Sequence, residues 1–413
     1  MEKRKFWSYE NKLVTIFFFV IGFVFFDRLA INFLVPFIQK DFTLTNTQIG
    51  LLGSALSLVW AFSSPLGGFL SDKVKSRKTV LAIFVLGFSV ISLSQGLVAT
   101  FALLFVLRMI MGLLEGPIVP ITQSILVAES SESRRGFNLG FTLNTANGVF
   151  GSFLAPLVIV ALANLFDWRT AFYLTIIPGI MIVFFIWKSV REPKRLSEEA
   201  ASQTSAIEKL SLKDVLGHRN IWLTVLIFSC FMIYLMAFQI FGPVYMVNDK
   251  HMSTTTMSFV MAAFGAGTAI LGFVVPAISD RIGRKPTALI FGFLSIFAPF
   301  AILYVQSEML MVVLVFLFSS GMGVGALLMS VIPSESVPAK YRGIAIGLTT
   351  GIGELFGGVL NPIFSGMAAD VWGLSAPLLI SSCGALLAFI LSMFLIETAP
   401  VKIQANSGIK MDV

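Results

Sequence analysis

Twelve long apolar runs constrain this chain of 413 residues more than any other feature of its sequence. Each run holds about 20 residues or more, enough for a helix to cross the hydrocarbon core of a bilayer. Lipid offers no partner to backbone N–H and C=O groups, so a spanning segment must satisfy them within its own helix. The sequence therefore predicts an all-α membrane protein with twelve transmembrane helices. The expected spans are 13–38, 46–70, 79–97, 101–125, 137–164, 169–189, 220–246, 256–279, 286–305, 309–332, 342–368 and 375–396.

Composition supports this class. Hydrophobic residues make up 56% of the chain and charged residues 12%, whereas a soluble domain averages about 25% charged residues. The first span is too long for a cleaved signal peptide and lacks a small-residue cleavage site, so we expect it to remain as a helix. The sequence contains no Walker motif, metal-ligand cluster or nucleophile arrangement. We therefore expect neither an enzyme nor an ATP-driven pump, and no cofactor or metal.

A short polar signature occurs twice, reading GGFLSDKVKSRK from position 67 and PAISDRIGRK from position 276. Its aspartates are 208 residues apart, while its arginines and a later Arg-Gly pair are 207 residues apart. This nearly constant offset indicates two homologous halves, and parallel repeats with a substrate site between them are one way of building a transporter. We expect six-helix bundles at residues 1–190 and 219–413. The cytoplasmic linker between them, at 191–218, is expected to be partly disordered or a short surface helix.

The repeated signature places an acid and a base near the same helix end in both halves. Asp72 and Arg77 belong to the first copy, and Asp280 and Arg284 belong to the second. The cations alone could serve as determinants of orientation, but that role would not need a carboxylate at the same place twice. We expect an interhelical charge lock, a conformational gate that keeps one face closed and breaks when the bundles move.

The distribution of Lys and Arg predicts the orientation in the membrane. One set of segments, which includes both termini, holds 24 of the 29 basic residues. The opposite loops hold Lys40, Arg169 and Lys250. Basic residues stay on the cytoplasmic side, so we expect both termini inside the cell. The net charge of +7 is then a consequence of topology, and we expect no nucleic-acid partner.

Five ionisable residues fall well inside the expected spans: Asp27, Arg28, Arg108, Glu115 and Glu354. Each costs a few kcal/mol or more at the bilayer centre, which makes each a functional candidate. The alternative is that they neutralise one another and only hold helices together. Adjacent residues on a helix point about 100° apart, so Asp27 and Arg28 face different neighbours. Arg108 and Glu115 lie two turns apart on one face, about 10 Å along the axis, too far for a direct pair within the helix.

The charged set is not repeated between the halves. At the offset of 207 residues Glu115 corresponds to Met322, whereas Glu354 corresponds to Asn147. This asymmetry is expected if the N-terminal half binds and couples while both halves form the gate. We assign Asn147 and Glu354 to the substrate site.

The chain resembles the major facilitator superfamily over essentially its whole length, and the repeated signature is quite specific for it. The first third further resembles the anion:cation symporter family, which takes up organic anions such as sugar acids with protons. The residues that carry this resemblance read FDRLAIN at 26–32, QIGLLGSA at 48–55 and Arg-x6-Glu-Gly-Pro-x2-Pro at 108–120.

The resemblance implies a role for each matching residue. Arg28 would bind the substrate carboxylate, beside Trp60 as an aromatic wall. Asp27 and Glu115 would be the proton-linked acids, and Arg108 would be the partner of Asp27 and part of the substrate site. In the eleventh helix, where the family often has Asn, this chain has Glu354. This acid would either take up a further proton or bind a cationic or hydroxyl-rich part of the substrate.

These observations favour a secondary transporter that imports a small organic anion, such as a sugar acid, by proton symport. We expect a monomer in the lipid bilayer of a bacterial cell (inner) membrane. The alternative is a proton-coupled drug or metabolite exporter on the same fold. Against it, the fifth helix reads GVFGSFLAPLV from position 148, without the Gly-Pro and glycine pair of the efflux pattern. A membrane sensor is a third class, but no segment is long enough for a signalling domain.

Overall fold

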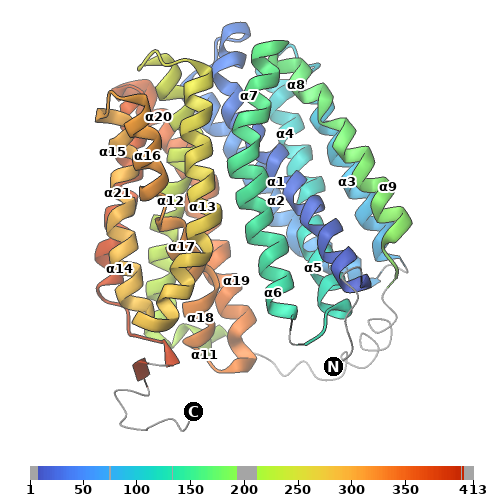
Figure 1. Cartoon of the computed structure of the whole chain (residues 1–413), viewed down its shortest axis with the longest axis vertical. Helices are drawn as coiled ribbons and strands as arrows, with labels where there is room; N and C mark the ends of the chain where they lie inside the picture. Colours follow the sequence, from blue (N-terminus) through green and yellow to red (C-terminus); the bar gives the residue numbers. More distant parts are fainter. Residues whose placement is uncertain (1–7, 74–75, 133, 193–211, 401, 404–413) are drawn as a thin grey trace. The chain divides into compact units, whose positions relative to one another are not determined.

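The computed structural model describes residues 8–73, 76–132, 134–192, 212–400 and 402–403. Helices account for nearly all of them, and these residues contain no β-strand (Figure 1). Within these described ranges, twelve helical segments are long and apolar enough to cross a membrane. The twelve predicted spans are confirmed, and each predicted end lies within four residues of an observed one.

The first six spans contain single and interrupted helices. They are α1 (Tyr9–Asp41), α2 (Asn46–Lys73), α3 (Arg77–Gln95), α4 with α5 (Phe101–Glu115, Ile118–Glu129), α6 through α7 (Arg135–Gly140, Ala155–Leu165) and α8 with α9 (Trp168–Leu174, Ile176–Ser189). The π-helical segments η1 (Phe141–Thr145) and η2 (Asn147–Leu154) join α6 to α7.

The second six spans follow the short helix α11 (Leu212–Leu216). They are α12 (Arg219–Asn248), α13 (Thr254–Ile282), α14 with α15 (Arg284–Ser295, Phe297–Tyr304), α16 through α18 (Glu308–Phe318, Gly321–Ala326, Ile332–Glu335), α19 with α20 (Arg342–Gly353, Asn361–Trp372) and α21 (Ser375–Ser392). The π-helical segments η3 (Leu327–Val331) and η5 (Glu354–Leu360) interrupt the tenth and eleventh spans.

Polar caps explain why several helices begin before their apolar runs. Ser8, Ser76, Ser253 and Ser307 each accept a hydrogen bond from the backbone N–H three residues later. A hydroxyl at this position satisfies one of the donors that a helix N-terminus leaves without a partner. The helix can therefore extend into polar sequence that hydropathy alone does not include.

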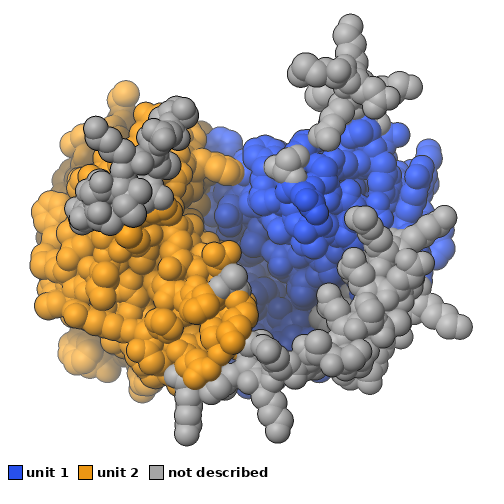
Figure 2. Space-filling view, turned by 90° about the horizontal axis from the view of Figure 1, so that it is seen from below, with its two compact units in different colours: residues 1–44, 55–208 blue, residues 45–54, 209–413 orange. Residues whose placement is uncertain are grey.

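The residues form two compact units, shown in different colours in Figure 2. Unit 1 comprises residues 1–44 and 55–208, and unit 2 comprises residues 45–54 and 209–413. The first turns of α2 therefore belong to the unit that holds the C-terminal half, which the sequence repeat did not predict. In the predicted linker, 193–211 lies outside the described residues, and α11 is a short helix that packs through Val215 onto α12 and α19.

Within unit 2, Asp370 caps the start of α2. Its two carboxylate oxygens accept hydrogen bonds from the backbone N–H groups of Asn46 and Thr47, at 2.8 and 3.0 Å. The Thr47 hydroxyl donates a third bond at 2.6 Å. Negative charge at a helix N-terminus is also favoured by the helix dipole. The end of α20 thus fixes a segment more than 300 residues away in the sequence.

Small residues bring α2 and α20 close together in this part of unit 2. A Cβ atom on Gly50 would lie 2.0 Å from the Pro362 carbonyl oxygen, and one on Gly366 would lie 2.4 Å from the Asn46 carbonyl oxygen. Further along α2, the Ser54 hydroxyl donates to the Val359 carbonyl at 2.7 Å. Backbones approach this closely in membranes where glycine and serine face one another.

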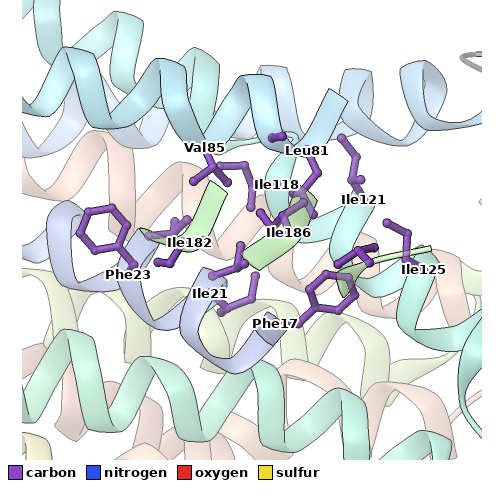
Figure 3. Close-up of a cluster of buried hydrophobic side chains, with 14 of the residues drawn as sticks. Phe17, Ile21, Phe23, Leu81, Val85, Ile118, Ile121, Ile125, Ile182 and Ile186 are labelled. Atoms are coloured by element: carbon purple, nitrogen blue, oxygen red, sulfur yellow. The ribbon is translucent and has the colours of Figure 1, made fainter. Parts of the chain in front are cut away.

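An apolar core holds unit 1 together (Figure 3). Buried side chains from α1, α3, α5 and α9 meet there, among them Phe17, Leu81, Ile121 and Ile186. In unit 2, α12 packs along α21, where a Cβ atom on Gly384 would lie 2.9 Å from the Cys230 carbonyl oxygen. Each core fixes the helices that carry the polar side chains described next.

Replacing Asp370 by Ala should loosen the start of α2. Loss of a capping carboxylate costs about 1 kcal/mol, so amide exchange over residues 45–54 should accelerate by roughly fivefold. Hydrogen–deuterium exchange of the purified protein measures this. Asp167→Ala is the matched control, because Asp167 caps α8 within its own segment. Unchanged exchange over 45–54 in Asp370→Ala would contradict the cap.

Candidate functional site

Three ionisable side chains of apolar helices are enclosed within unit 1. Asp27 lies on α1, and Arg108 and Glu115 lie on α4; their exposed fractions are 0%, 2% and 0%. A charged group facing lipid is costly, so such side chains turn toward the protein interior. The structure therefore gathers three of the predicted site residues in one buried polar cluster.

Asp27 is held by a neighbour that the sequence interpretation missed. The Ser92 hydroxyl on α3 donates to Oδ1 of Asp27 at 2.6 Å, and the Thr175 hydroxyl lies 2.9 Å from that of Ser92. The other carboxylate oxygen has no hydrogen-bond partner among the described residues. The sequence signal was a polar stripe on α3, since Ser89, Ser92 and Gln95 recur every three residues and all are buried.

The resemblance implied that Arg108 is the partner of Asp27. No ion pair joins them within the part of the chain that the structure describes. One guanidinium nitrogen of Arg108 donates to the Arg28 carbonyl at 3.0 Å, and the other lies 3.5 Å from the Met111 sulfur. Arg108 still attracts the Asp27 carboxylate through space. The carbonyl contact fixes Arg108 against α1 instead.

Glu115 is the last residue of α4 and is fully buried. Neither of its carboxylate oxygens has a hydrogen-bond partner among the described residues, and no ion pair to Arg108 is formed there, as the sequence predicted. Glycines let α2 approach this end of α4. A Cβ atom on Gly116 would lie 1.9 Å from the Ser63 hydroxyl, and Ser63 donates to the Gly112 carbonyl at 2.9 Å.

Arg28 faces a different neighbour from Asp27, as their adjacency on α1 predicted. Its guanidinium donates to the Ser57 hydroxyl at 3.0 Å and lies 5.1 Å from the centre of the Trp60 ring. Arg28 and Trp60 are half-buried. A planar guanidinium supported in this way can present a bidentate surface to a carboxylate.

Asn147 and Glu354 occupy equivalent places in their respective units. Asn147 begins η2 in unit 1, and Glu354 begins η5 in unit 2. Segments of π-helix are rare and often accompany functional sites. The Glu354 carboxylate lies along its own helix, where a Cβ atom on Gly358 would approach its Oε1 to 2.6 Å. The sequence offset had paired these two positions without predicting the change of helix type.

Of the predicted gate residues, Arg284 forms the best-defined contacts. It donates to Asp280 at 2.5 Å, four residues earlier, and to both oxygens of Glu335 on α18 at 2.9 and 3.2 Å. The Asp72 side chain lies outside the described part of the structure, and Arg77 is buried. Glu335 was missed. The repeat could have identified it, because each Arg-Gly landmark is preceded by an acid, six residues earlier in the first half and seven in the second.

Two further carboxylates bind equivalent helix starts. Glu192 accepts from the backbone N–H groups of Arg77 and Lys78 at 3.1 Å each, at the start of α3. Glu397 accepts from those of Arg284 and Lys285 at 2.7 and 3.1 Å, at the start of α14. Each acid lies beyond the last span of its half. The sequence interpretation gave Glu397 no role, but it joins the end of unit 2 to the gate signature.

Most of the sequence matches the model of one protein family. The family model of the Major Facilitator Superfamily matches residues 17–355 and 240–411. The chain belongs to this superfamily. It is a multi-pass membrane transporter and not an enzyme.

Curated relatives carry the names of sugar-acid transporters. The hexuronate transporter of Bacillus subtilis is 30% identical over 287 residues, which cover 67% of this chain and 66% of that protein. The probable galactarate/D-glucarate transporter of Bacillus subtilis is 26% identical over 424 residues, covering 94% and 92%. A D-galactonate transporter of Escherichia coli is 26% identical, covering 91% and 92%. The resemblance to sugar-acid transporters is confirmed.

Solved structures share the fold of this superfamily member. An inward-facing bacterial homologue of the lysosomal transporter Spinster matches with a TM-score of 0.78 and 17% identity, covering 94% of this chain and 98% of that one. A D-xylose-proton symporter matches with a TM-score of 0.75 and 17% identity, covering 95% and 99%. These likenesses confirm the predicted fold class.

Neutralising the two partners of Arg284 should have unequal effects on stability. Glu335 and Arg284 are 21% and 9% exposed, whereas Asp280 is 66% exposed. Glu335→Gln should lower the free energy of unfolding by about 2 kcal/mol, the range for hydrogen bonds to charged groups. Asp280→Asn, the matched control, should cost less than about 1 kcal/mol. Thermal unfolding in detergent compares them, and equal losses would contradict this order.

Proposed function

We propose that this transporter imports a small organic anion of the sugar-acid class together with protons, across the cytoplasmic membrane of a bacterium. The observation that carries the proposal is the buried cluster of unit 1, which combines two acids with Arg108 close to the half-buried Arg28. The names of the relatives supply the substrate class.

The charges of the cluster provide a mechanism for coupling. With Asp27 and Glu115 ionised, the two acids balance Arg28 and Arg108, and an anion gains little by entering. Each acid that is protonated from outside leaves one positive charge unbalanced, and an anion binds when its own charge matches the number of protons taken up. On the inner side the acids lose their protons, restore the balance and expel the anion. A carrier with unbalanced charge in its core should change conformation slowly, which links the substrate to the protons.

Each site residue has a proposed role. Arg28 receives the substrate carboxylate, Trp60 provides an aromatic wall, and Arg108 adds positive charge. Asn147 and Glu354 act on the remainder of the substrate, which is rich in hydroxyl groups in a sugar acid. Glu354 either accepts hydrogen bonds from those hydroxyls or takes up a further proton.

We assign the conformational change to movement of two six-helix bundles, residues 1–190 and 219–413. The linker at 191–218 joins them. The gate consists of the repeated residues Asp72, Arg77, Asp280 and Arg284, to which we add Glu335. The excess of Lys and Arg supports cytoplasmic termini, so the gate lies at the cytoplasmic face. All proposed groups belong to one chain, consistent with a monomer.

Arg28 provides a direct test of the anion site. In proteoliposomes with an acidic exterior, wild-type protein should accumulate at least one sugar acid from a panel of hexuronates, galactarate and galactonate. Arg28→Lys retains the charge but loses the planar fork, so affinity should fall at least about tenfold, and Arg28→Ala should abolish binding. Normal affinity in Arg28→Ala would place the anion site elsewhere. Efflux driven by the same gradient would indicate the exporter.

Substitution of Glu115 tests anion binding and proton coupling separately. Gln imitates the protonated acid, so Glu115→Gln should bind the anion but cannot release a proton. Exchange of labelled for unlabelled substrate across the membrane should continue, while accumulation driven by a pH gradient should be lost. Counterflow and uptake in the same proteoliposomes measure the two activities. Accumulation at the wild-type level would reduce Glu115 to a structural residue.

A further inference from the structure

A row of hydroxyl groups leads away from Asp27 inside unit 1. Ser92 on α3 and Thr175 at the junction of α8 and α9 are 0% and 3% exposed, so water is excluded from both. Ser92 donates to Asp27 at 2.6 Å, Thr175 lies 2.9 Å from Ser92, and the Thr175 hydroxyl lies 2.7 Å from the Phe172 carbonyl. The row therefore runs from carboxylate to hydroxyl to hydroxyl to carbonyl.

The row of hydroxyl groups ends at the break between α8 and α9, where Thr175 lies. The backbone N–H of Thr175 donates to the carbonyl three residues earlier, that of Phe172, at 3.2 Å, instead of the α-helical partner four residues earlier. The Thr175 hydroxyl donates to the same carbonyl at 2.7 Å. A carbonyl oxygen has two lone pairs and can accept both bonds. Close packing holds the end of α3 against α8, because a Cβ atom on Gly96 would lie 2.7 Å from the Arg169 carbonyl oxygen. The hydroxyls of Ser92 and Thr175 are thereby fixed at hydrogen-bond distance.

Each hydroxyl carries one hydrogen atom but can also accept, so the row has two complete arrangements. With Asp27 ionised, Thr175 donates to Ser92 and Ser92 donates to the carboxylate. With Asp27 protonated, the carboxyl donates to Ser92, Ser92 donates to Thr175, and Thr175 donates to the Phe172 carbonyl. Oδ1 of Asp27 is hydrogen-bonded in both arrangements, and apart from the proton that Asp27 gains or loses, they differ only by rotation of the hydroxyl groups.

We propose that Ser92 is a positioning residue for Asp27, and that Ser92, Thr175 and the Phe172 carbonyl form a hydrogen-bond chain that reverses when Asp27 gains or loses a proton. The inference rests on the proposed proton coupling. Ser92 stabilises the ionised carboxylate in a buried site by donating a hydrogen bond to it.

The charged groups around Asp27 are Arg108 and Glu115 on α4 and Arg28 on its own helix. α3 and the junction of α8 and α9 contribute the neutral hydroxyls of Ser92 and Thr175. The charges of α4 attract and repel Asp27 through space. Ser92, by contrast, donates the hydrogen bond that Asp27 accepts within the described structure.

The second half of the chain serves as an internal comparison. At the offset of 207 residues, Asp27 corresponds to Tyr234 and Ser92 corresponds to Pro299. Tyr234 is buried, and its hydroxyl has no hydrogen-bond partner among the residues described. Where the repeat lacks the acid it also lacks the hydroxyl of Ser92. This is expected if Ser92 serves the acid and not the packing of the fold.

The test compares Ser92→Ala with Ser89→Ala, a matched control on the same buried face whose hydroxyl donates to the Val85 carbonyl of its own helix. Without its donor, ionised Asp27 takes up a proton more readily, so the pH profile of substrate binding should move about one unit toward alkaline pH. Ser89→Ala should leave the profile in place, and Ser92→Thr, which keeps a hydroxyl, should restore it. Equal profiles for Ser92→Ala and Ser89→Ala would overturn the proposal.

A second measurement does not depend on transport. Thermal unfolding of the purified protein should show a deficit for Ser92→Ala that grows as the pH rises, since the lost donor matters when Asp27 is ionised. The deficit should not vary with pH in an Asp27→Asn background, and Thr175→Val should behave like a weaker Ser92→Ala. A pH-dependent deficit that persists in the Asp27→Asn background would overturn the proposal. If wild-type protein shows no proton-driven uptake but these stability results hold, the proposed function fails while the role of Ser92 stands.

Discussion

The cost of placing an ionisable group in an apolar medium organises this molecule. The ionisable side chains of Asp27, Arg108 and Glu115 lie among the apolar residues of α1 and α4. Helices α1, α3 and α4 enclose them. Enclosure requires close approach of backbones, which the small residues at the end of α4 allow. Enclosure also removes water, so the neighbouring hydroxyls and carbonyls become the groups that stabilise each charge. Both close packing and polar contacts are therefore needed to keep these ionisable groups within the membrane.

The two halves are alike where they hold their ends together and unlike where they hold charge. Glu192 and Glu397 bind the starts of α3 and α14 in the same way, and π-helical segments begin at the paired positions Asn147 and Glu354. The acid at position 27, in contrast, has a tyrosine as its counterpart. A duplicated scaffold whose halves carry different ionisable residues allows each unit a different role.

Much of the fold could be predicted from the sequence because lipid leaves few alternatives to a helix. The buried charges were equally visible, since Asp27 or Glu115 stands out against apolar neighbours. Hydroxyls such as Ser92 were not, because a serine in a membrane helix often bonds its own backbone, as Ser89 does with Val85. The contacts of Glu397 and Asp370 could not be derived from local pattern either, because their partners lie more than 100 residues away. Nor could the sequence predict that Arg108, the expected partner of Asp27, donates its hydrogen bond to the Arg28 carbonyl.

α2 is one continuous helix, yet its first turns belong to unit 2 and the rest belongs to unit 1. A helix is stiff along its axis, and its backbone hydrogen bonds resist a change of direction within a single turn. Any displacement of one unit against the other must therefore bend α2 near Ser54 and Ala55 or detach the segment that Asp370 and Gly50 secure. The energy needed for either event adds to the cost of such a displacement. The segment that Asp370 and Gly50 secure contains none of the residues proposed to bind the anion, so its attachment can be altered without replacing any of them.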